Sequence, residues 1–271
     1  NSRYTEAANS PSAESHAGRF EPLGNVTTRH APVSASSTYS PSPAVSALHT
    51  SPAFFFLAAD AFAALAALGL GLPDAQVRQL LDYQSLIGKW NKVYNLTALR
   101  EPQEILSHHL LDSLSAIAPL MRQAQPFGEA FSFLDVGSGG GLPGVVIAIC
   151  CPNVAVTCVD AVSKKAAFVQ QVAASLRLSN LKGVHARVET LAGPFDVIGS
   201  RAFASLPDFV SWSASALAPN GIWMAMKGKL PEEEIATLPP YAQVFHVEQL
   251  HVPGLNAERC MVWMKKSTAL S

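Results

Sequence analysis

The sequence predicts an α/β fold with a mostly parallel, Rossmann-like sheet, helices on both of its faces, and a helical extension on the N-terminal side. Three observations lead to this prediction. After Phe127, short apolar runs of strand length alternate with helical patterns. The first of these runs enters a glycine-rich turn within residues 133–144, and a helical pattern follows at once. Before Phe127, apolar residues recur with helical spacing instead.

The apolar runs predict seven strands. The last two are expected to be joined by a turn at Pro253-Gly254 and to form an antiparallel pair. The expected strands are residues 131–136, 154–159, 183–186, 195–200, 222–226, 244–252 and 259–265.

The chain divides by composition into three segments. Residues 1–52 are rich in Ser, Pro, Thr and Ala and lack apolar periodicity, so we expect a disordered or non-native extension. Residues 53–126 form the expected helical region. Residues 127–271 form the expected sheet domain, packed with these helices as one unit.

Three helices are expected in the helical region. The first is the alanine-rich stretch 53–72, which ends near Gly69; the second begins at Pro73-Asp74; the third covers 102–121. Asp60 interrupts the first stretch, and an aspartate at the centre of a membrane helix costs roughly 2.5–3.5 kcal/mol. A helix packed on the domain is therefore favoured over a membrane span.

The net charge and the cysteine content limit which partners and metal sites the chain can have. The formal net charge is -1 at pH 7, so no global positive field attracts nucleic acid, and any RNA contact must come from a local patch. The four cysteines have no metal-ligand spacing, so we expect buried thiols in a reducing compartment and no metal site. Candidates for a basic patch are Lys89, Lys92, Arg100, Lys164, Lys165, Arg187 and Lys227.

The glycine-rich turn carries the strongest chemical signal. The frame Asp135-x-Gly137-x-Gly139-x-Gly141 is typical of the first motif of S-adenosylmethionine-dependent methyltransferases. A carboxylate just before the first glycine suits a ligand with an ammonium and a sulfonium group, and it would repel a pyrophosphate. The alternative is a dinucleotide fold, since Gly139-x-Gly141-x-x-Gly144 also fits G-x-G-x-x-G, although this register starts late relative to the strand.

Polar residues follow the next two strands. Asp160 comes 23 residues after Gly137, at the position where an acid accepts hydrogen bonds from ribose hydroxyls in nucleoside-binding folds. Its alternative role is a helix N-cap. Val188 and Glu189 follow the third strand, where an adenine ring is expected to lie. Glu189 is equally well explained as a solvated acid at the start of a helix.

Arg201 leaves the fourth strand at the substrate end of the sheet. A guanidinium suits bidentate contact with a guanine edge or a phosphate, so we predict a catalytic role for Arg201. The alternative is an ion pair that fastens the strand exit to a neighbouring helix.

These motifs together identify a family. In the order below, and over about residues 56–266, the chain resembles the bacterial small-subunit ribosomal RNA guanine-N7 methyltransferases called RsmG or GidB. The motifs are Trp90-Asn91, Asn95-Leu96-Thr97, His109, Asp112-Ser113, Leu134-Asp135-Val136-Gly137, Gly141-Leu142-Pro143-Gly144, Arg187-Val188-Glu189 and Ser200-Arg201-Ala202-Phe203.

The resemblance implies a class I methyltransferase that transfers a methyl group from S-adenosylmethionine to N7 of guanine 527 in 16S ribosomal RNA. The RNA would be presented alone, in the 30S subunit or in an assembly intermediate, in the cytoplasm, to an enzyme that we expect to be a monomer without membrane contact. Cofactor contacts carried over by motif, together with the glycine frame and the ribose acid, fall on Gly137, Gly139, Gly141, Leu142, Asp160, Val188, Glu189 and Arg201.

Overall fold

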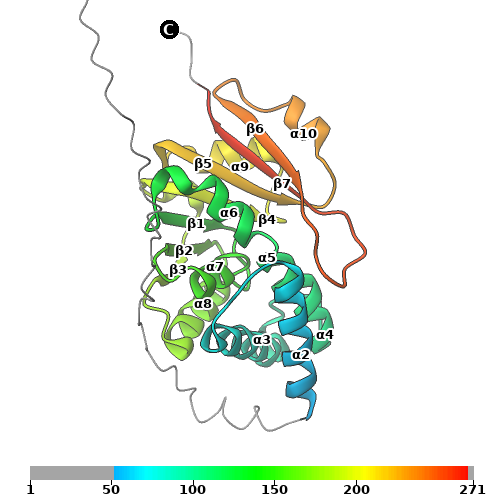
Figure 1. Cartoon of the computed structure of the whole chain (residues 1–271). Helices are drawn as coiled ribbons and strands as arrows, with labels where there is room; N and C mark the ends of the chain where they lie inside the picture. The colour runs from blue at the N-terminus through cyan, green and yellow to red at the C-terminus, as the bar shows by residue number, and fades with distance from the viewer. Residues whose placement is uncertain (1–51, 268–271) are drawn as a thin grey trace, which may run out of the picture. The chain divides into compact units, whose positions relative to one another are not determined.

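The computed structural model describes residues 52–267, which include a seven-stranded sheet of order β3-β2-β1-β4-β5-β7-β6 (Figure 1). The extension predicted for residues 1–52 falls outside the described residues except for Pro52. The strands are β1 Ser132–Val136, β2 Ala155–Asp160, β3 Leu181–His185, β4 Phe195–Arg201, β5 Leu217–Lys227, β6 Ala242–Gln249 and β7 Cys260–Lys266.

The sheet is mostly parallel, as predicted. β1 lies between β2 and β4 and is parallel to both, with Val136 opposite Val159 on one side and Ser200 on the other. β7 is antiparallel to both β5 and β6, which confirms an antiparallel final pair. β5 begins at Leu217, five residues before the predicted start at 222. The prediction started late because Pro219-Asn220-Gly221 interrupts the apolar pattern of the strand.

The helices depart from prediction at one place. The helix expected over 102–121 is broken: a π-helical turn, Leu106–Leu111, interrupts it, and a new helix starts at Ile117. In such a turn the backbone hydrogen bonds join residues i and i+5, and these turns are frequent at functional sites. The helical segments are α2 Pro52–Ala67, α3 Asp74–Tyr94, α4 Pro102–Ile105, η1 Leu106–Leu111, α5 Asp112–Leu114, α6 Ile117–Gln123, η2 Gln125–Phe127, α7 Gly144–Cys150, α8 Ser163–Leu176, η3 Val188–Thr190, α9 Leu206–Ser213 and α10 Glu232–Ala236.

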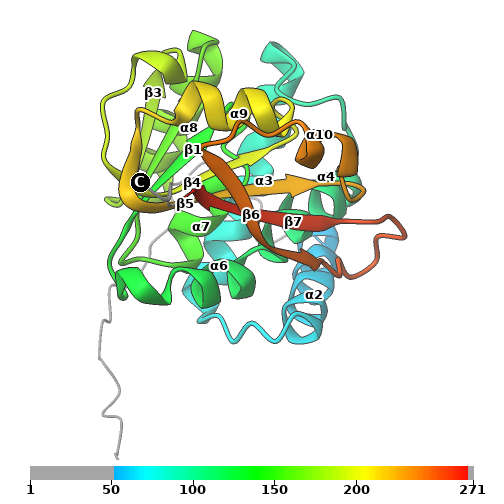
Figure 2. The same ribbon diagram turned by 90° about the horizontal axis from the view of Figure 1, so that it is seen from above.

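Helices cover both faces of the sheet. Figure 2 shows α9 and α10 on one side of the sheet and α2, α6 and α7 on the other. Alternate strand residues enter the two cores because side chains alternate along a strand: Phe133 packs with α3, α7 and α8, whereas Leu134 packs with α9. Within residues 52–267, no helix has the length and apolar character needed to cross a bilayer.

The connecting helices change from one face of the sheet to the other, and this change determines where a ligand can bind. The chain runs outward from β1 through β2 to β3, with α7 and α8 on one face, and then returns to β4 and continues through α9 on the other. Helical connections therefore diverge at the β1–β4 boundary. In open α/β sheets the ligand crevice lies outside the carboxyl ends of the strands at this point.

The start of α7 is packed tightly under β1. The backbone N–H of Gly144 donates to Asp135 Oδ2 at 2.8 Å. A Cβ on Gly144 would overlap Cys158 Sγ and lie 2.8 Å from Asp135 Oδ2.

We therefore expect Gly144→Ala to reduce the free energy of unfolding by about 1–3 kcal/mol through overpacking. Urea unfolding followed by circular dichroism measures the change. Gly140→Ala is the matched control, because a Cβ there meets nothing within 4 Å. Equal stability of the two variants would contradict the close packing at Gly144.

Candidate functional site

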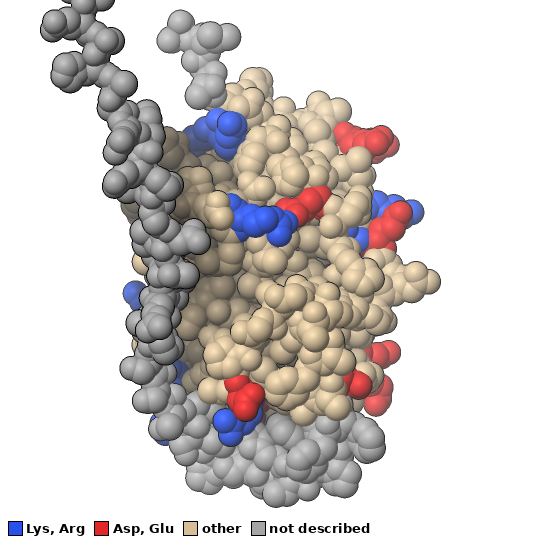
Figure 3. Space-filling model, in the orientation of Figure 1, with Lys and Arg blue, Asp and Glu red and all other residues tan. Residues whose placement is uncertain are grey.

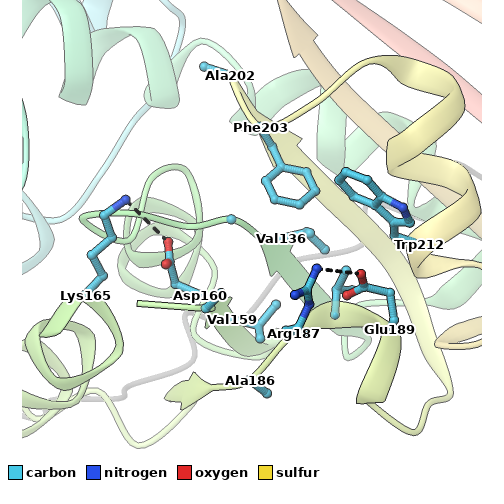
Figure 4. A pocket seen from close by; sticks show the side chains of 13 residues that line it. Val136, Val159, Asp160, Lys165, Ala186, Arg187, Glu189, Ala202, Phe203 and Trp212 are labelled. Carbon is cyan, nitrogen blue, oxygen red and sulfur yellow. Dashed lines mark ion pairs between the residues drawn. The ribbon is translucent and has the colours of Figure 1, made fainter. Parts of the chain in front are cut away.

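Two adjoining cavities lie at the carboxyl ends of the strands around the β1–β4 boundary. The first has a volume of about 430 Å³ and lies beyond β1, β2 and β3 (Figure 4). The second, of about 200 Å³, is lined by the glycine turn, by Arg201 and by residues from the helical region. Gly137, Lys165 and Ala202 line both, so the two cavities form one elongated site.

The first cavity combines an apolar wall with acids at its rim. In Figure 4, Val136 and Val159 lie on the sheet side, while Phe203 and Trp212 lie together on the β4 side with their ring centroids 5.8 Å apart. Asp160 lies opposite, 3.8 Å from Lys165 Nζ. An apolar slot beside a strand-end carboxylate can receive a flat heterocycle and its sugar.

The glycine turn is fixed to the neighbouring strand. Gly139 has a φ of 57° and donates its N–H to Asp160 Oδ2 at 3.0 Å, and Val162 N donates to Asp160 Oδ1 at 2.8 Å. Tyr83, fully buried on α3, donates its hydroxyl to the carbonyl of Gly140. Helix α3 of the helical region therefore helps to shape the ligand turn.

Asp135 lies beneath the turn and is fully buried. Burial raises the pKa of its carboxyl to about 7, against the lowering effect of the Gly144 hydrogen bond and of the Arg201 charge. Its Oδ1 and the hydroxyl of Ser138 are buried without a hydrogen-bond partner. Unpaired buried polar atoms are costly. Ser138 lines the second cavity, where a polar ligand could satisfy its hydroxyl, whereas Asp135 lines neither cavity and can act on a ligand only through its charge.

Arg201 is held by the helical region. Its Nη1 lies 2.9 Å from Asp112 Oδ2 and donates to the carbonyl of His108 at 3.1 Å. Asp112 also accepts from Arg259 Nε at 2.8 Å, so one buried carboxylate has two guanidinium partners. The ion pair that was the alternative role of Arg201 is thus present, yet Arg201 still lines the second cavity.

His109 lies on the π-helical turn and faces the same cavity. Its Nε2 is 2.6 Å from Thr97 Oγ1, and its Nδ1 is 3.4 Å from Arg201 Nη2. Burial and the adjacent Arg201 charge lower the pKa of His109 to about 4. The imidazole is therefore neutral at pH 7 and is a weak base.

The chain is similar to proteins of known family. A family model described as GidB, rRNA small subunit methyltransferase G, matches residues 76–262. A protein named ribosomal RNA small subunit methyltransferase G from Polaromonas sp. (strain JS666 / ATCC BAA-500) is 66% identical over 212 residues, which cover 78% of this chain and 94% of that protein. One of the same name from Paracidovorax citrulli (strain AAC00-1) is 62% identical over 223 residues, covering 77% and 92%.

The chain belongs to the GidB family, the rRNA small subunit methyltransferases G. The predicted family, fold class and methyltransferase activity are thereby confirmed. Among solved structures, TrmN from Thermus thermophilus is similar with a TM-score of 0.46 and 18% identity, covering 60% of this chain and 53% of that one.

The structure of this GidB chain brings most of the predicted site residues to the two cavities. Gly141 is the exception: it lines neither, and a Cβ there would overlap the Val145 side chain. Gly141 therefore serves the turn into α7. Gly137, Asp160, Val188 and Glu189 line the first cavity, and Gly137, Gly139, Leu142 and Arg201 line the second.

Several site residues were not predicted as such. Thr97 and His109 belong to motifs of the GidB resemblance, but without the fold nothing in their spacing places them opposite the glycine turn. Lys165 was predicted as a candidate for the basic patch, but not as a residue that lines the cavities. Arg259 lies 147 positions from Asp112, and no local pattern signals that contact.

The open side of Gly139 leads to a prediction about ligand binding in this GidB chain. A Cβ on Gly139 would meet only the Gly137 carbonyl, at 4.0 Å, and so would enter the site rather than the core. The positive φ also disfavours a β-branched residue. We expect Gly139→Val to abolish binding of S-adenosylhomocysteine while leaving the fold largely intact. Calorimetry and circular dichroism test this, and unchanged affinity would contradict the assignment of the turn.

Proposed function

We propose that this protein transfers a methyl group from S-adenosylmethionine to N7 of guanine 527 in 16S ribosomal RNA, in the cytoplasm. The observation that carries the proposal is the pair of adjoining cavities. The first suits the adenosine half of the cofactor, and the second, with Arg201, His109 and Thr97, suits the methionine end and the target base.

The residues present fit such a cofactor. Asp160 lines the first cavity, and its carboxylate, which already accepts the N–H groups of Gly139 and Val162, has lone pairs left for ribose hydroxyls. Val188, at the start of η3, offers an apolar contact for adenine. The unpartnered Ser138 hydroxyl lines the second cavity, and the carboxyl of Asp135 lies buried beneath the turn, so cationic groups of the amino acid end could bind in the second cavity. The cofactor supplies the methyl group.

The chemistry agrees with the side chains in the second cavity. Guanine N7 has a lone pair and no proton. Methylation would form the N7–C bond as the S–CH3 bond of the sulfonium breaks, with S-adenosylhomocysteine as leaving group and the positive charge passing to the base, so it requires no general base. A weakly basic His109 is consistent with this reaction. The tasks left to the protein are to align the base and to exclude water, for which Arg201 can donate to the guanine edge or its phosphate.

The dinucleotide alternative is less well supported. Family membership favours a methyltransferase, and a buried carboxylate directly beneath the turn would repel a pyrophosphate once ionised. Calorimetry with S-adenosylhomocysteine and with NAD separates the two, because only the first is expected to bind.

The decisive experiment is transfer of tritiated methyl groups to 30S particles from a strain that lacks the enzyme, followed by mapping of the modified base. Naked 16S RNA and assembly intermediates are tested in parallel. We expect one labelled guanine, alkylated at N7. Label at another base, or none on any of the three substrates, would refute the proposal.

A further inference from the structure

A line of aromatic rings runs from the core to the surface beside the second cavity. Phe168 on α8 is fully buried, Trp90 on α3 lies 5.2 Å from it between ring centroids, and Tyr94 lies 5.0 Å beyond Trp90. Tyr94 is the last residue of α3 and is 41% exposed. Its ring is thus supported from below by the core and presented to solvent.

The surroundings of Tyr94 are apolar and basic. Val93 beside it is 69% exposed, and Val162, two residues before Lys164 in the chain, is 47% exposed. Lys164 places its Nζ 5.5 Å from the centroid of the Tyr94 ring. Exposed aromatic rings interleaved with lysines are the features with which proteins bind single-stranded RNA, by base stacking and phosphate contact.

This surface adjoins the second cavity from two sides. Leu96 and Thr97, two and three residues after Tyr94, line that cavity. Since an extended chain spans at most about 3.6 Å per residue, the Cα of Tyr94 lies within about 7 Å of that of Leu96. On α8, Lys165 lines both cavities and directly follows Lys164. A strand with its target base in the second cavity could therefore reach Tyr94.

Two other basic residues that the sequence offered for RNA contact pair with acids. Lys227 lies 2.8 Å from Glu234 and Lys165 lies 3.8 Å from Asp160, whereas Lys164 is exposed over an aromatic ring. On the face seen in Figure 3, the charged side chains that are visible are sparse and of both signs.

We propose that Tyr94 and Lys164 form a nucleotide subsite in which the base next to the target guanine stacks on Tyr94 and its phosphate binds Lys164. This proposal rests on the function proposed above. The core-supported ring supplies the platform, and Lys164 exchanges its contact with the ring for the phosphate.

The test measures KM and kcat on unmethylated 30S particles and filter binding of the same particles. We expect Tyr94→Ala to raise KM and the dissociation constant about 10-fold, with kcat within about twofold, since stacking on one base is worth about 5- to 150-fold in affinity. Tyr94→Phe retains the ring and should behave like the wild type. Lys164→Ala should weaken binding and reduce the salt slope of log K by about 0.7.

Phe245→Ala is the matched control. Phe245 is 38% exposed with Lys265 Nζ 5.6 Å from its ring centroid, the same arrangement on the edge strand β6. Its substitution should change neither KM nor binding. Melting temperature and S-adenosylhomocysteine affinity of every variant report any loss of fold, and Lys164→Ala, at an exposed position, tests the subsite even if Tyr94→Ala unfolds.

A KM for Tyr94→Ala within twofold of the wild-type value would overturn the subsite, as would an equal rise in Phe245→Ala. If Tyr94→Ala does not fold, an unchanged salt slope in Lys164→Ala overturns it. Filter binding requires no methyl transfer, so it tests the subsite separately. Failure of the wild-type protein to methylate any ribosomal RNA would instead contradict the proposed function.

Discussion

Arg201→Ala is expected to lower the single-turnover rate of methyl transfer by about 10- to 1000-fold, which corresponds to roughly 1.4–4 kcal/mol. Arg201 is the cation that lines the second cavity from the end of β4. Its side chain is 18% exposed and lies against Asp112 and His109, so its position is fixed. Affinity for S-adenosylhomocysteine should fall less than turnover does.

Arg201→Lys tests whether the positive charge alone is sufficient or whether the planar guanidinium is needed. Arg201→Lys keeps one cation but cannot bridge Asp112, the His108 carbonyl and His109 together, because it lacks the planar fork. We expect this variant to retain cofactor binding better than turnover. Single-turnover rate, calorimetry and melting temperature are measured on both variants.

Arg259→Ala is the matched control for a purely structural role of Arg201. Each of the two arginines donates to one oxygen of Asp112, so either substitution leaves that buried carboxylate with one cationic partner. If Arg201 serves only as an ion pair, both alanine variants lose melting temperature and activity in parallel. Turnover that falls far more in Arg201→Ala, at a similar melting temperature, supports a role in the site.

Local patterns predicted the sheet well because each signal lies within a few residues. The run before Gly137 and the acid at Asp160 are read from strand length and spacing, and both lie at strand ends as expected. The broken helix was not predictable in the same way. Apolar spacing over 102–121 fits a continuous helix, and no proline marks the π-helical turn, which alters the phase by one residue. Pro119, in the first turn of the helix that starts at Ile117, does mark the second break, and the prediction did not use it.

The part of the site that the helical region contributes could not be predicted from local sequence patterns. Tyr83, Thr97 and His109 reach the glycine turn only because α3 and η1 pack on the same face as α7 and α8. Arg201 was placed at the strand exit from sequence, but its partner Asp112 comes from a helix 89 residues earlier. Contacts at such separation depend on packing rather than on spacing.

Asp135 leads to the second prediction, which concerns pH. Its folded pKa of about 7 lies above the ordinary value of 3.8 because the carboxyl is buried. Between these two values the folded state binds more protons than the unfolded state, so the free energy of unfolding falls as pH rises and levels off above pH 7. A pKa difference of this size corresponds to a loss on the order of 4 kcal/mol.

Asp135→Asn should remove this loss. The amide is neutral at every pH and its oxygen can still accept from the Gly144 N–H, as Asp135 Oδ2 does at 2.8 Å. We expect the free energy of unfolding of the ligand-free variant to exceed that of the wild type by a few kcal/mol at pH 8, and the gap to close towards pH 4. Urea titrations of both proteins from pH 4 to 8 measure the difference in unfolding free energy. The contributions of the other carboxylates are the same in both proteins and cancel in this difference.

The same substitution should weaken cofactor binding. Asp135 lines neither cavity, but its carboxyl lies buried beneath the turn, so a cationic ligand bound over the turn should favour the ionised form through space. In the wild type, affinity for S-adenosylmethionine should therefore increase as pH rises through 7, whereas in Asp135→Asn it should be lower and nearly independent of pH over that range. The variant would thus be a more stable protein and a poorer binder, as expected where a buried charge is retained for function. A gap in unfolding free energy that stays constant from pH 4 to 8 would show that Asp135 ionises normally, and the ligand would then owe its binding to Asp160 and the backbone of the turn.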